Sequence, residues 1–149
     1  RGNVQTRLRK LEEEGYDVTL LAAAGLKRLG MEHAAGRYLS VDEMIPAAGQ
    51  GILAVQGRKG EIYYWISQVD DPVSRAAALA ERQFIRVLGG GCTSPSAAHA
   101  QISGNELKLT GLCWSEKSGQ YSRGVLCAEV SRAEQAGEEL AKRLLREAE

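Results

Sequence analysis

The chain has 149 residues, of which 44% are hydrophobic and 26% are charged, and its formal net charge is zero. This composition is typical of a globular protein, and a balanced charge provides no overall attraction to nucleic acid or to an anionic membrane. The longest apolar run, from Val18 to Leu26, is too short to span a bilayer, and Arg1 to Val4 show no apolar signal region. Three cysteines cannot form a closed set of disulfides, so they predict a reducing compartment, the cytoplasm.

The N-terminal part of the chain has an α-β-α pattern. Asn3 is a suitable N-cap for an amphipathic helix. Residues 18–22 are apolar enough for a short buried strand of the parallel type, and residues 23–29 predict a second helix. Roughly forty residues of this kind cannot bury a sheet by themselves. We therefore expect the end of a doubly wound α/β domain whose other strands lie elsewhere.

The middle of the chain is less regular. Residues 46–51 (Pro-Ala-Ala-Gly-Gln-Gly) are rich in turn formers, and residues 51–56 predict another buried strand. Residues 61–69 predict a helix with one apolar face. Asp71 and Pro72 then indicate a helix start, with an acidic N-cap and proline at the first helical position. An apolar stripe runs along the helix that follows.

The C-terminal part changes to the period of strands. Residues 97–102, 106–114 and 120–130 predict three strands that are separated by turn-forming residues. Residues 131–134 match a capping box, which predicts a last helix to the chain end. Residues 72–149 therefore predict an α-β-β-β-α arrangement. This is a small α+β domain with a three-stranded antiparallel sheet, large enough to fold alone.

A glycine-rich loop follows the helix that starts at Pro72. Three glycines precede Cys92, and Pro95 follows it. Glycine leaves room beside the chain for another molecule to approach, and proline fixes the exit of the loop. This pattern favours a thiol that is presented to a ligand. The alternative is an ordinary helix C-cap and turn in which the cysteine has no role.

Several other reactive side chains have simpler interpretations. Cys113 and Cys127 fall on predicted strands, where we expect them to be small buried hydrophobes. His33 and His99 have no metal-ligand spacing around them, so no metal site is expected. We expect Arg82 to form a structural ion pair with a nearby acid.

Five short motifs occur in a fixed order along the chain, and each of them is weak alone. They are Arg1-Gly2-Asn3-Val4-x-Thr6-Arg7-Leu8, Leu21-Ala22-x-Ala24-Gly25-Leu26-x-Arg28-Leu29, Pro46-Ala47-x-Gly49-Gln50-Gly51, Ala80-Glu81-Arg82 and Gly90-Gly91-Cys92-x-x-Pro95. Together they resemble the porphobilinogen deaminase family, also called hydroxymethylbilane synthase, of tetrapyrrole biosynthesis. The resemblance runs over essentially the whole chain and covers the C-terminal half of that family's protein.

The resemblance implies a division of the chain into three parts. Residues 1–46 resemble the end of domain two, an α/β domain similar to periplasmic binding proteins. Residues 47–71 resemble the segment that crosses back into domain one. Residues 72–149 resemble domain three, the α+β domain that carries the cofactor.

The resemblance also implies a chemistry. The family holds a dipyrromethane cofactor through a thioether to the loop cysteine, here Cys92, and a thiolate is a suitable nucleophile for a pyrrole methylene. On this primer four porphobilinogen molecules condense stepwise with release of ammonia, and hydrolysis then frees hydroxymethylbilane. The enzyme is a transferase of porphyrin and haem biosynthesis and requires no metal. The family's catalytic aspartate corresponds to no position in this chain, so no acid here is assigned that role.

Each pyrrole carries an acetate and a propionate, and arginine binds carboxylates bidentately while keeping its charge. The residues that match the family's cofactor-binding positions are arginines for the carboxylates and residues near the rings. The arginines are Arg1, Arg7 and Arg28, and the positions near the rings are Ala22, Gln50 and Gly51. The alternative is that the arginines are solvated helix charges.

Three functions compete at this point. The first is the C-terminal half of a porphobilinogen deaminase, which alone is expected to be inactive. Its partners are porphobilinogen, the growing linear bilane and the N-terminal half of the same enzyme, without nucleic acid or membrane, and the full-length form is expected to be a monomer. The second is a non-catalytic fragment that binds the cofactor or a bilane. The third is a redox protein that uses Cys92, which would need a resolving cysteine nearby in the sequence.

Overall fold

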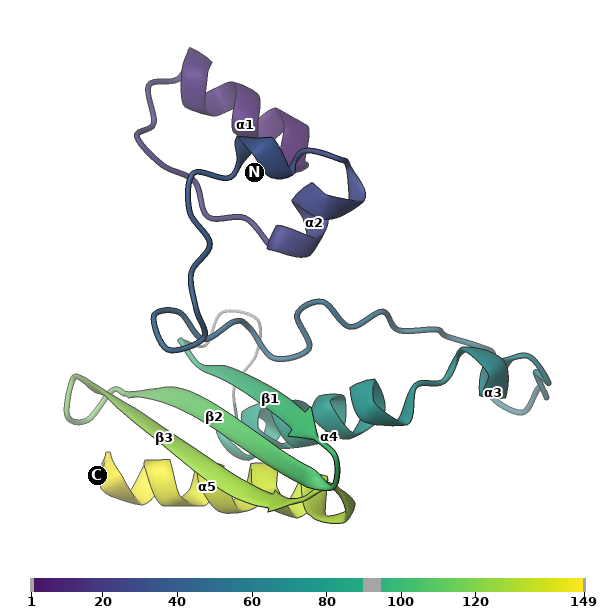
Figure 1. Ribbon diagram of the computed structural model, residues 1–149. Helices are drawn as coiled ribbons and strands as arrows, with labels where there is room; N and C mark the ends of the chain where they lie inside the picture. The colour runs from purple at the N-terminus through teal and green to yellow at the C-terminus, as the bar shows by residue number, and fades with distance from the viewer. Residues whose placement is uncertain (1, 90–94, 149) are drawn as a thin grey trace. The chain divides into compact units, whose positions relative to one another are not determined.

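The computed structural model describes residues 2–89 and 95–148. The chain separates into two compact units, Arg1–Leu39 and Ser40–Glu149, and each is described by itself (Figure 1).

The first unit is built from short helices. They are α1 (Val4–Glu13), α2 (Ala23–Arg28) and the 3₁₀ helix η1 (Glu32–Ala34). The predicted N-cap is confirmed, because Asn3 Oδ1 accepts a hydrogen bond of 2.8 Å from the Thr6 N–H. Leu26 on α2 is buried, with 5% of its surface exposed. The position of Gly25 on the same helix lies against Val4, so α1 and α2 are in contact.

Two predicted strands are not formed. Residues 18–22 and 51–56 have no strand structure, and the side chains of Val18 and Leu53 are 79% and 76% exposed. A strand of this apolar type needs neighbouring strands for its N–H and C=O groups and covering helices for its side chains. The part of the chain that the structure describes provides neither at these positions. The doubly wound sheet expected around these segments is therefore not seen.

The predicted helix over residues 61–69 is reduced to α3 (Ile66–Val69). Upstream of it, the Tyr63 hydroxyl accepts a hydrogen bond of 3.1 Å from the Arg58 N–H and donates to the Glu61 carboxylate, which holds these residues in a turn. The apolar face is exposed: Ile62 and Val69 are 78% and 58% exposed, and Trp65 contacts the ring of Tyr63 but is still 46% exposed. A helix this short is marginal in water without tertiary contacts, which explains the shortening.

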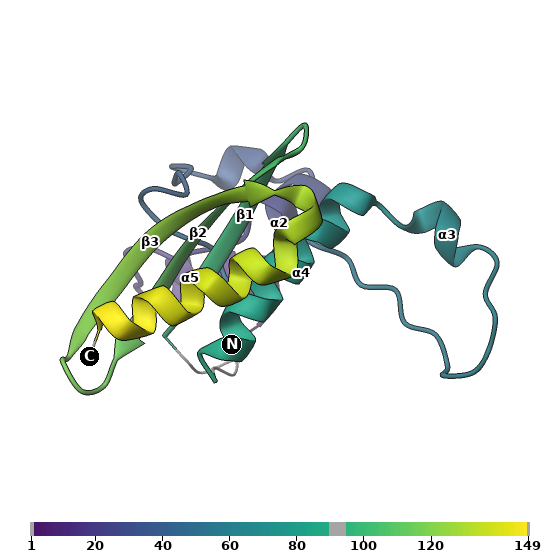
Figure 2. The same cartoon turned by 90° about the horizontal axis from the view of Figure 1, so that it is seen from below.

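The second unit contains the predicted α-β-β-β-α arrangement, which is confirmed. Its elements are α4 (Pro72–Val87), β1 (Ala97–Ser103), β2 (Glu106–Ser115), β3 (Gln120–Glu129), the 3₁₀ helix η2 (Val130–Arg132) and α5 (Ala133–Glu147). The sheet is antiparallel with the order β1-β2-β3. Both α4 and α5 lie against the same face of this sheet (Figure 2). Asp71 caps α4 as predicted, because its Oδ1 accepts from the Ser74 N–H at 2.9 Å.

The core lies between the two helices and the sheet. Leu107, Leu109 and Cys113 alternate along β2 and are buried against Phe84 of α4 and Leu140 of α5, among other apolar side chains. The helices approach most closely at Gly137, where an added Cβ would lie 2.3 Å from the Ala80 carbonyl oxygen. This close approach requires glycine on α5.

Two local predictions for this unit are wrong. The Ser131 hydroxyl donates to the Glu129 carboxylate instead of capping a helix, because η2 takes up residues 130–132 and α5 begins only at Ala133. Cys127 is exposed, because the alternation along β3 places it on the face away from the helices. Cys113, on the covered face of β2, is buried as predicted.

Candidate functional site

The residues predicted to form a site are distributed over both units. Arg7, Ala22 and Arg28 belong to the first unit, and Gln50 and Gly51 belong to the second. Arg1 and Cys92 lie outside the described residues, so their predicted roles stay predictions.

Arg7 is oriented by the segment that leads to Ala22. Its Nη2 donates to the Thr19 Oγ1 and to the Leu20 carbonyl oxygen, both at 3.0 Å. The side chain is half-buried against this segment. Its Nε and Nη1 have no hydrogen-bond partner within residues 2–89 and 95–148, so they are available to a carboxylate. Arg7 therefore combines a structural role with a capacity to bind an anion.

Ala22 and Arg28 lie at the two ends of α2. Ala22 is the N-cap residue and is exposed, and Arg28 is exposed in the last turn of the helix. The rise of an α-helix separates the two positions by roughly 9 Å. Arg28 has no ion-pair partner in the described part of the chain, which leaves its whole guanidinium available for a ligand.

Gln50 and Gly51 end a tight turn over residues 47–51, which we call the 47–51 turn. The Gln50 N–H donates to the Ala47 carbonyl at 3.0 Å, and the Ile52 N–H donates to the Gly49 carbonyl at 3.1 Å. Gly49 and Gly51 have φ angles of +77° and +87°, which other residues rarely adopt. Gln50 and Gly51 are exposed, so both can be reached by a ligand.

Sequence reasoning missed the residue that fixes this turn. Glu81 of α4 is only 3% exposed, and its carboxylate accepts hydrogen bonds from the Gly49 N–H at 2.6 Å and from the Ala100 N–H at 2.8 Å. The available signal was a charge within the apolar stripe of α4, four residues after Ala77 and three before Phe84. Its neighbour Arg82 is exposed and forms no ion pair within the described residues, so the predicted pair is absent there.

The two described cysteines differ in burial. Burial raises the pKa of the Cys113 thiol, which lowers its thiolate fraction and makes it a poor nucleophile. Cys127 is a free thiol on the exposed face of β3. Among residues 2–89 and 95–148, no three His, Cys, Asp or Glu side chains are grouped so that they could hold a metal ion.

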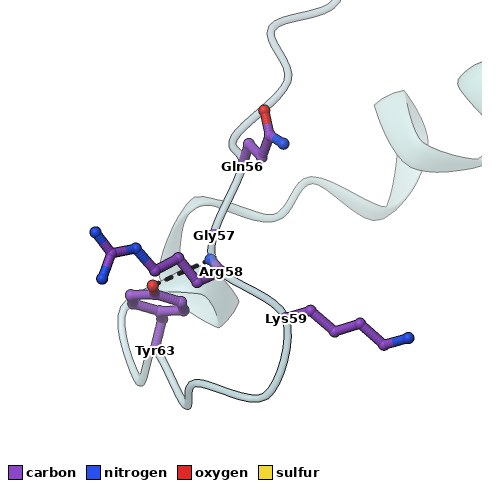
Figure 3. Close-up of a pocket in the computed structure, with 5 residues that line it drawn as sticks. All are labelled: Gln56, Gly57, Arg58, Lys59 and Tyr63. Carbon is purple, nitrogen blue, oxygen red and sulfur yellow. Dashed lines mark hydrogen bonds between the residues drawn. The ribbon is translucent and has the colours of Figure 1, made fainter.

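One open hollow of about 670 Å³ lies in the second unit, and none of the predicted site residues is part of its lining. Its lining is Gln56, Gly57, Arg58, Lys59 and Tyr63. Figure 3 shows that the side chains of Arg58 and Lys59 point to opposite sides of the loop, so they do not converge on one ligand. We therefore assign no site to this hollow.

No helix among the described residues is both long enough and apolar enough to cross a membrane.

Comparison with known proteins identifies the class to which both units belong. A family model described as "Porphobilinogen deaminase, dipyromethane cofactor binding domain" matches residues 1–63. A second model, "Porphobilinogen deaminase, C-terminal domain", matches residues 76–146. The two matches account for nearly all of the chain.

Individual relatives agree with the family models. The chain is 46% identical to the porphobilinogen deaminase of Ruminiclostridium josui over 144 residues, which are 97% of this chain and 50% of that protein. It is 46% identical to the porphobilinogen deaminase of Roseiflexus castenholzii over 147 residues, 97% of this chain and 48% of that protein. The corresponding protein of Acetivibrio thermocellus is 43% identical over all 149 residues, and the chain covers 51% of it.

The chain belongs to the porphobilinogen deaminase family. It spans about half the length of the curated relatives that it matches.

Proposed function

We propose that this chain works as part of a porphobilinogen deaminase, a transferase of haem and porphyrin biosynthesis that condenses four porphobilinogen molecules into hydroxymethylbilane with release of ammonia. The observation that carries the proposal is the family match at 46% identity over 97% of the chain. Its partners are porphobilinogen, the growing bilane and the N-terminal half of the same enzyme. The full-length enzyme is proposed to be a monomer on the family resemblance alone. The two described cysteines are free thiols, which fits the cytoplasm.

The described residues fit a covalently held dipyrromethane. This group carries several carboxylates, and Arg28 together with the free Nε and Nη1 of Arg7 provides cationic donors for them. Gly51 has no side chain to obstruct a flat ring, and Gln50 is exposed beside it. When bound, dipyrromethane supplies the free pyrrole α-carbon that each condensation extends. Cys92 would hold it by a thioether, and Ala22 would leave space beside a ring.

The proposal includes the arrangement of the whole protein. Residues 1–46 belong to a domain-two α/β layer, residues 47–71 cross into domain one, and residues 72–149 form domain three. The exposure of Val18 and Leu53 supports the first two assignments, because these segments lack the neighbours that a buried strand requires. The break between the two family matches, from residue 63 to residue 76, lies close to the proposed start of domain three.

A hybrid protein tests the proposed function. The 149 residues replace the matching half of the Ruminiclostridium josui relative, and that relative serves as the positive control. We expect the hybrid to consume porphobilinogen and the 149-residue chain alone to be inactive. The pocket needs residues from both halves of the enzyme, and the expected catalytic aspartate belongs to the other half. Activity of the chain alone would contradict the assignment of the catalytic groups. A hybrid that carries dipyrromethane without turnover would favour the alternative of a non-catalytic cofactor-binding chain.

Arginine substitutions in the hybrid test the carboxylate contacts. Arg28→Leu should lower kcat/KM by about 10- to 100-fold, since a charge-assisted hydrogen bond contributes on the order of 1.5–3 kcal/mol, and its melting temperature should not change. Arg28→Lys should also be impaired, because a point charge does not replace a bidentate fork. Arg7→Leu should reduce both kcat/KM and stability, because it also loses the contacts to Thr19 and Leu20.

The matched control for these variants is Arg9→Leu. Arg9 is an exposed arginine on α1, and the one ion pair that it forms within residues 2–89 and 95–148 is with Glu13 at 3.4 Å. Its loss should leave kcat/KM within about twofold of the unmodified hybrid, because exposed pairs contribute little. Equal effects of Arg9→Leu and Arg28→Leu would assign Arg28 to the solvated surface.

A further inference from the structure

The carboxylate of Glu81 is a buried charge that two backbone N–H groups satisfy. Gly49 lies 32 residues before it and Ala100 lies 19 residues after it, and each bonds to a different carboxylate oxygen. A buried charge is costly unless its hydrogen bonds are made. The imidazole of His99 lies beside them, with its Nδ1 3.6 Å from Glu81 Oε1. The two backbone contacts supply the hydrogen bonds that this buried carboxylate needs.

The first contact lies at the edge of the sheet. β1 is an edge strand, so its outward N–H groups have no strand partner. Glu81 Oε1 accepts one of them, from Ala100, in a buried position. This contact attaches α4 to β1 independently of the apolar core.

The second contact reaches the 47–51 turn. Oε2 accepts from the Gly49 N–H, the residue directly before Gln50. Within the part of the chain that the structure describes, the turn has few other attachments, namely its own two backbone bonds and the packing of Ala48 against the core. Farther upstream, Arg123 holds Asp42 separately. Its Nη1 donates to the Asp42 carbonyl oxygen at 2.8 Å, and its Nη2 donates to Asp42 Oδ1 at 3.1 Å. Loss of the Glu81 contact would therefore release the turn locally.

We propose that Glu81 is a positioning residue whose carboxylate holds the 47–51 turn against α4 and β1, so that Gln50 and Gly51 are fixed in place for a pyrrole ligand. The role of the turn in binding rests on the proposed function, whereas the attachment itself does not. The carboxylate is required, because both of its partners are donors and an amide has only one acceptor oxygen.

Hydrogen exchange of the 149-residue chain tests the attachment. In the unmodified chain the Gly49 amide should exchange at least about tenfold more slowly than the Gly60 amide, another turn glycine with positive φ, which donates to no side chain of the described residues. Glu81→Gln should accelerate exchange at Gly49, Gln50 and Ile52 at least tenfold and leave Leu109 in β2 within threefold. Equal exchange at Gly49 and Gly60 in the unmodified chain would overturn the attachment even if the variant failed to fold.

The matched control is Glu139→Gln. Glu139 is an exposed acid on α5 that pairs with Arg132 at 2.8 Å, and its replacement should change none of these exchange rates. If Glu139→Gln accelerated exchange at Gly49 as much as Glu81→Gln does, the attachment would be refuted.

Kinetics of the hybrid protein test the positioning role. Glu81→Gln should raise KM for porphobilinogen at least fivefold, with the amount of bound dipyrromethane per protein unchanged. A merely structural defect would lower the active fraction, and with it the apparent kcat, without changing KM. An unchanged KM together with faster exchange at Gly49 would overturn the positioning role. An unmodified hybrid without activity or cofactor would refute the proposed function instead, and the exchange experiment would still decide the attachment.

Discussion

Replacing Cys92 with serine in the hybrid protein should abolish attachment of the pyrrole cofactor, and with it all turnover. A serine hydroxyl is almost fully protonated near neutral pH and is a far weaker nucleophile than a partly ionised thiol. In the sequence three glycines directly precede Cys92, and glycine leaves room beside the chain for another molecule to approach. The measurement is the colour reaction of a dipyrromethane with an acidic aldehyde reagent, together with the intact mass of the protein.

The other two cysteines supply the controls for this experiment. Cys127→Ser removes an exposed thiol, and Cys113→Ser removes a buried thiol whose raised pKa lowers its thiolate fraction. Both variants should keep the attached pyrroles. If the Cys92→Ser variant gave the same colour yield as the unmodified hybrid, Cys92 would not be the attachment site. If only the Cys127→Ser variant lost the colour, the attachment site would be Cys127 on β3.

Replacing Phe84 with alanine should cause the largest loss of stability in the second unit. Phe84 is fully buried, and a Cβ at Gly111 would lie 2.6 Å from its ring, so the ring lies directly on the sheet. Removal of a buried phenylalanine costs about 3–5 kcal/mol, through lost transfer energy and the cavity left behind. A domain of this size has about 5–15 kcal/mol of stability, so the loss is a large fraction of the total.

Urea unfolding followed by circular dichroism measures this change. The matched control is Leu79→Ala on the same helix, where the side chain is 47% exposed and the expected loss is below about 1 kcal/mol. A Phe84→Ala variant as stable as Leu79→Ala would show that the space between α4, α5 and the sheet is not the core of this unit.

The sequence by itself predicted the elements whose signals are local. The caps Asn3 and Asp71 are formed as expected, because an N-cap depends on N–H groups only three residues away. The strands of the C-terminal unit lie within one residue of their predicted bounds, since alternation and turn residues are also local. The ordered motifs indicated the family, which the two family matches then showed.

Only the tertiary structure decided the features that depend on residues far apart in the sequence. Residues 18–22 and 51–56 form no strands, because strand structure requires partners that the described residues do not provide. Cys127 is exposed because β3 carries apolar side chains on both faces, and only the packing of α4 and α5 determines which face is covered. Glu81 could not be assigned from sequence, since its partners Gly49 and Ala100 come close to α4 only after the chain has folded.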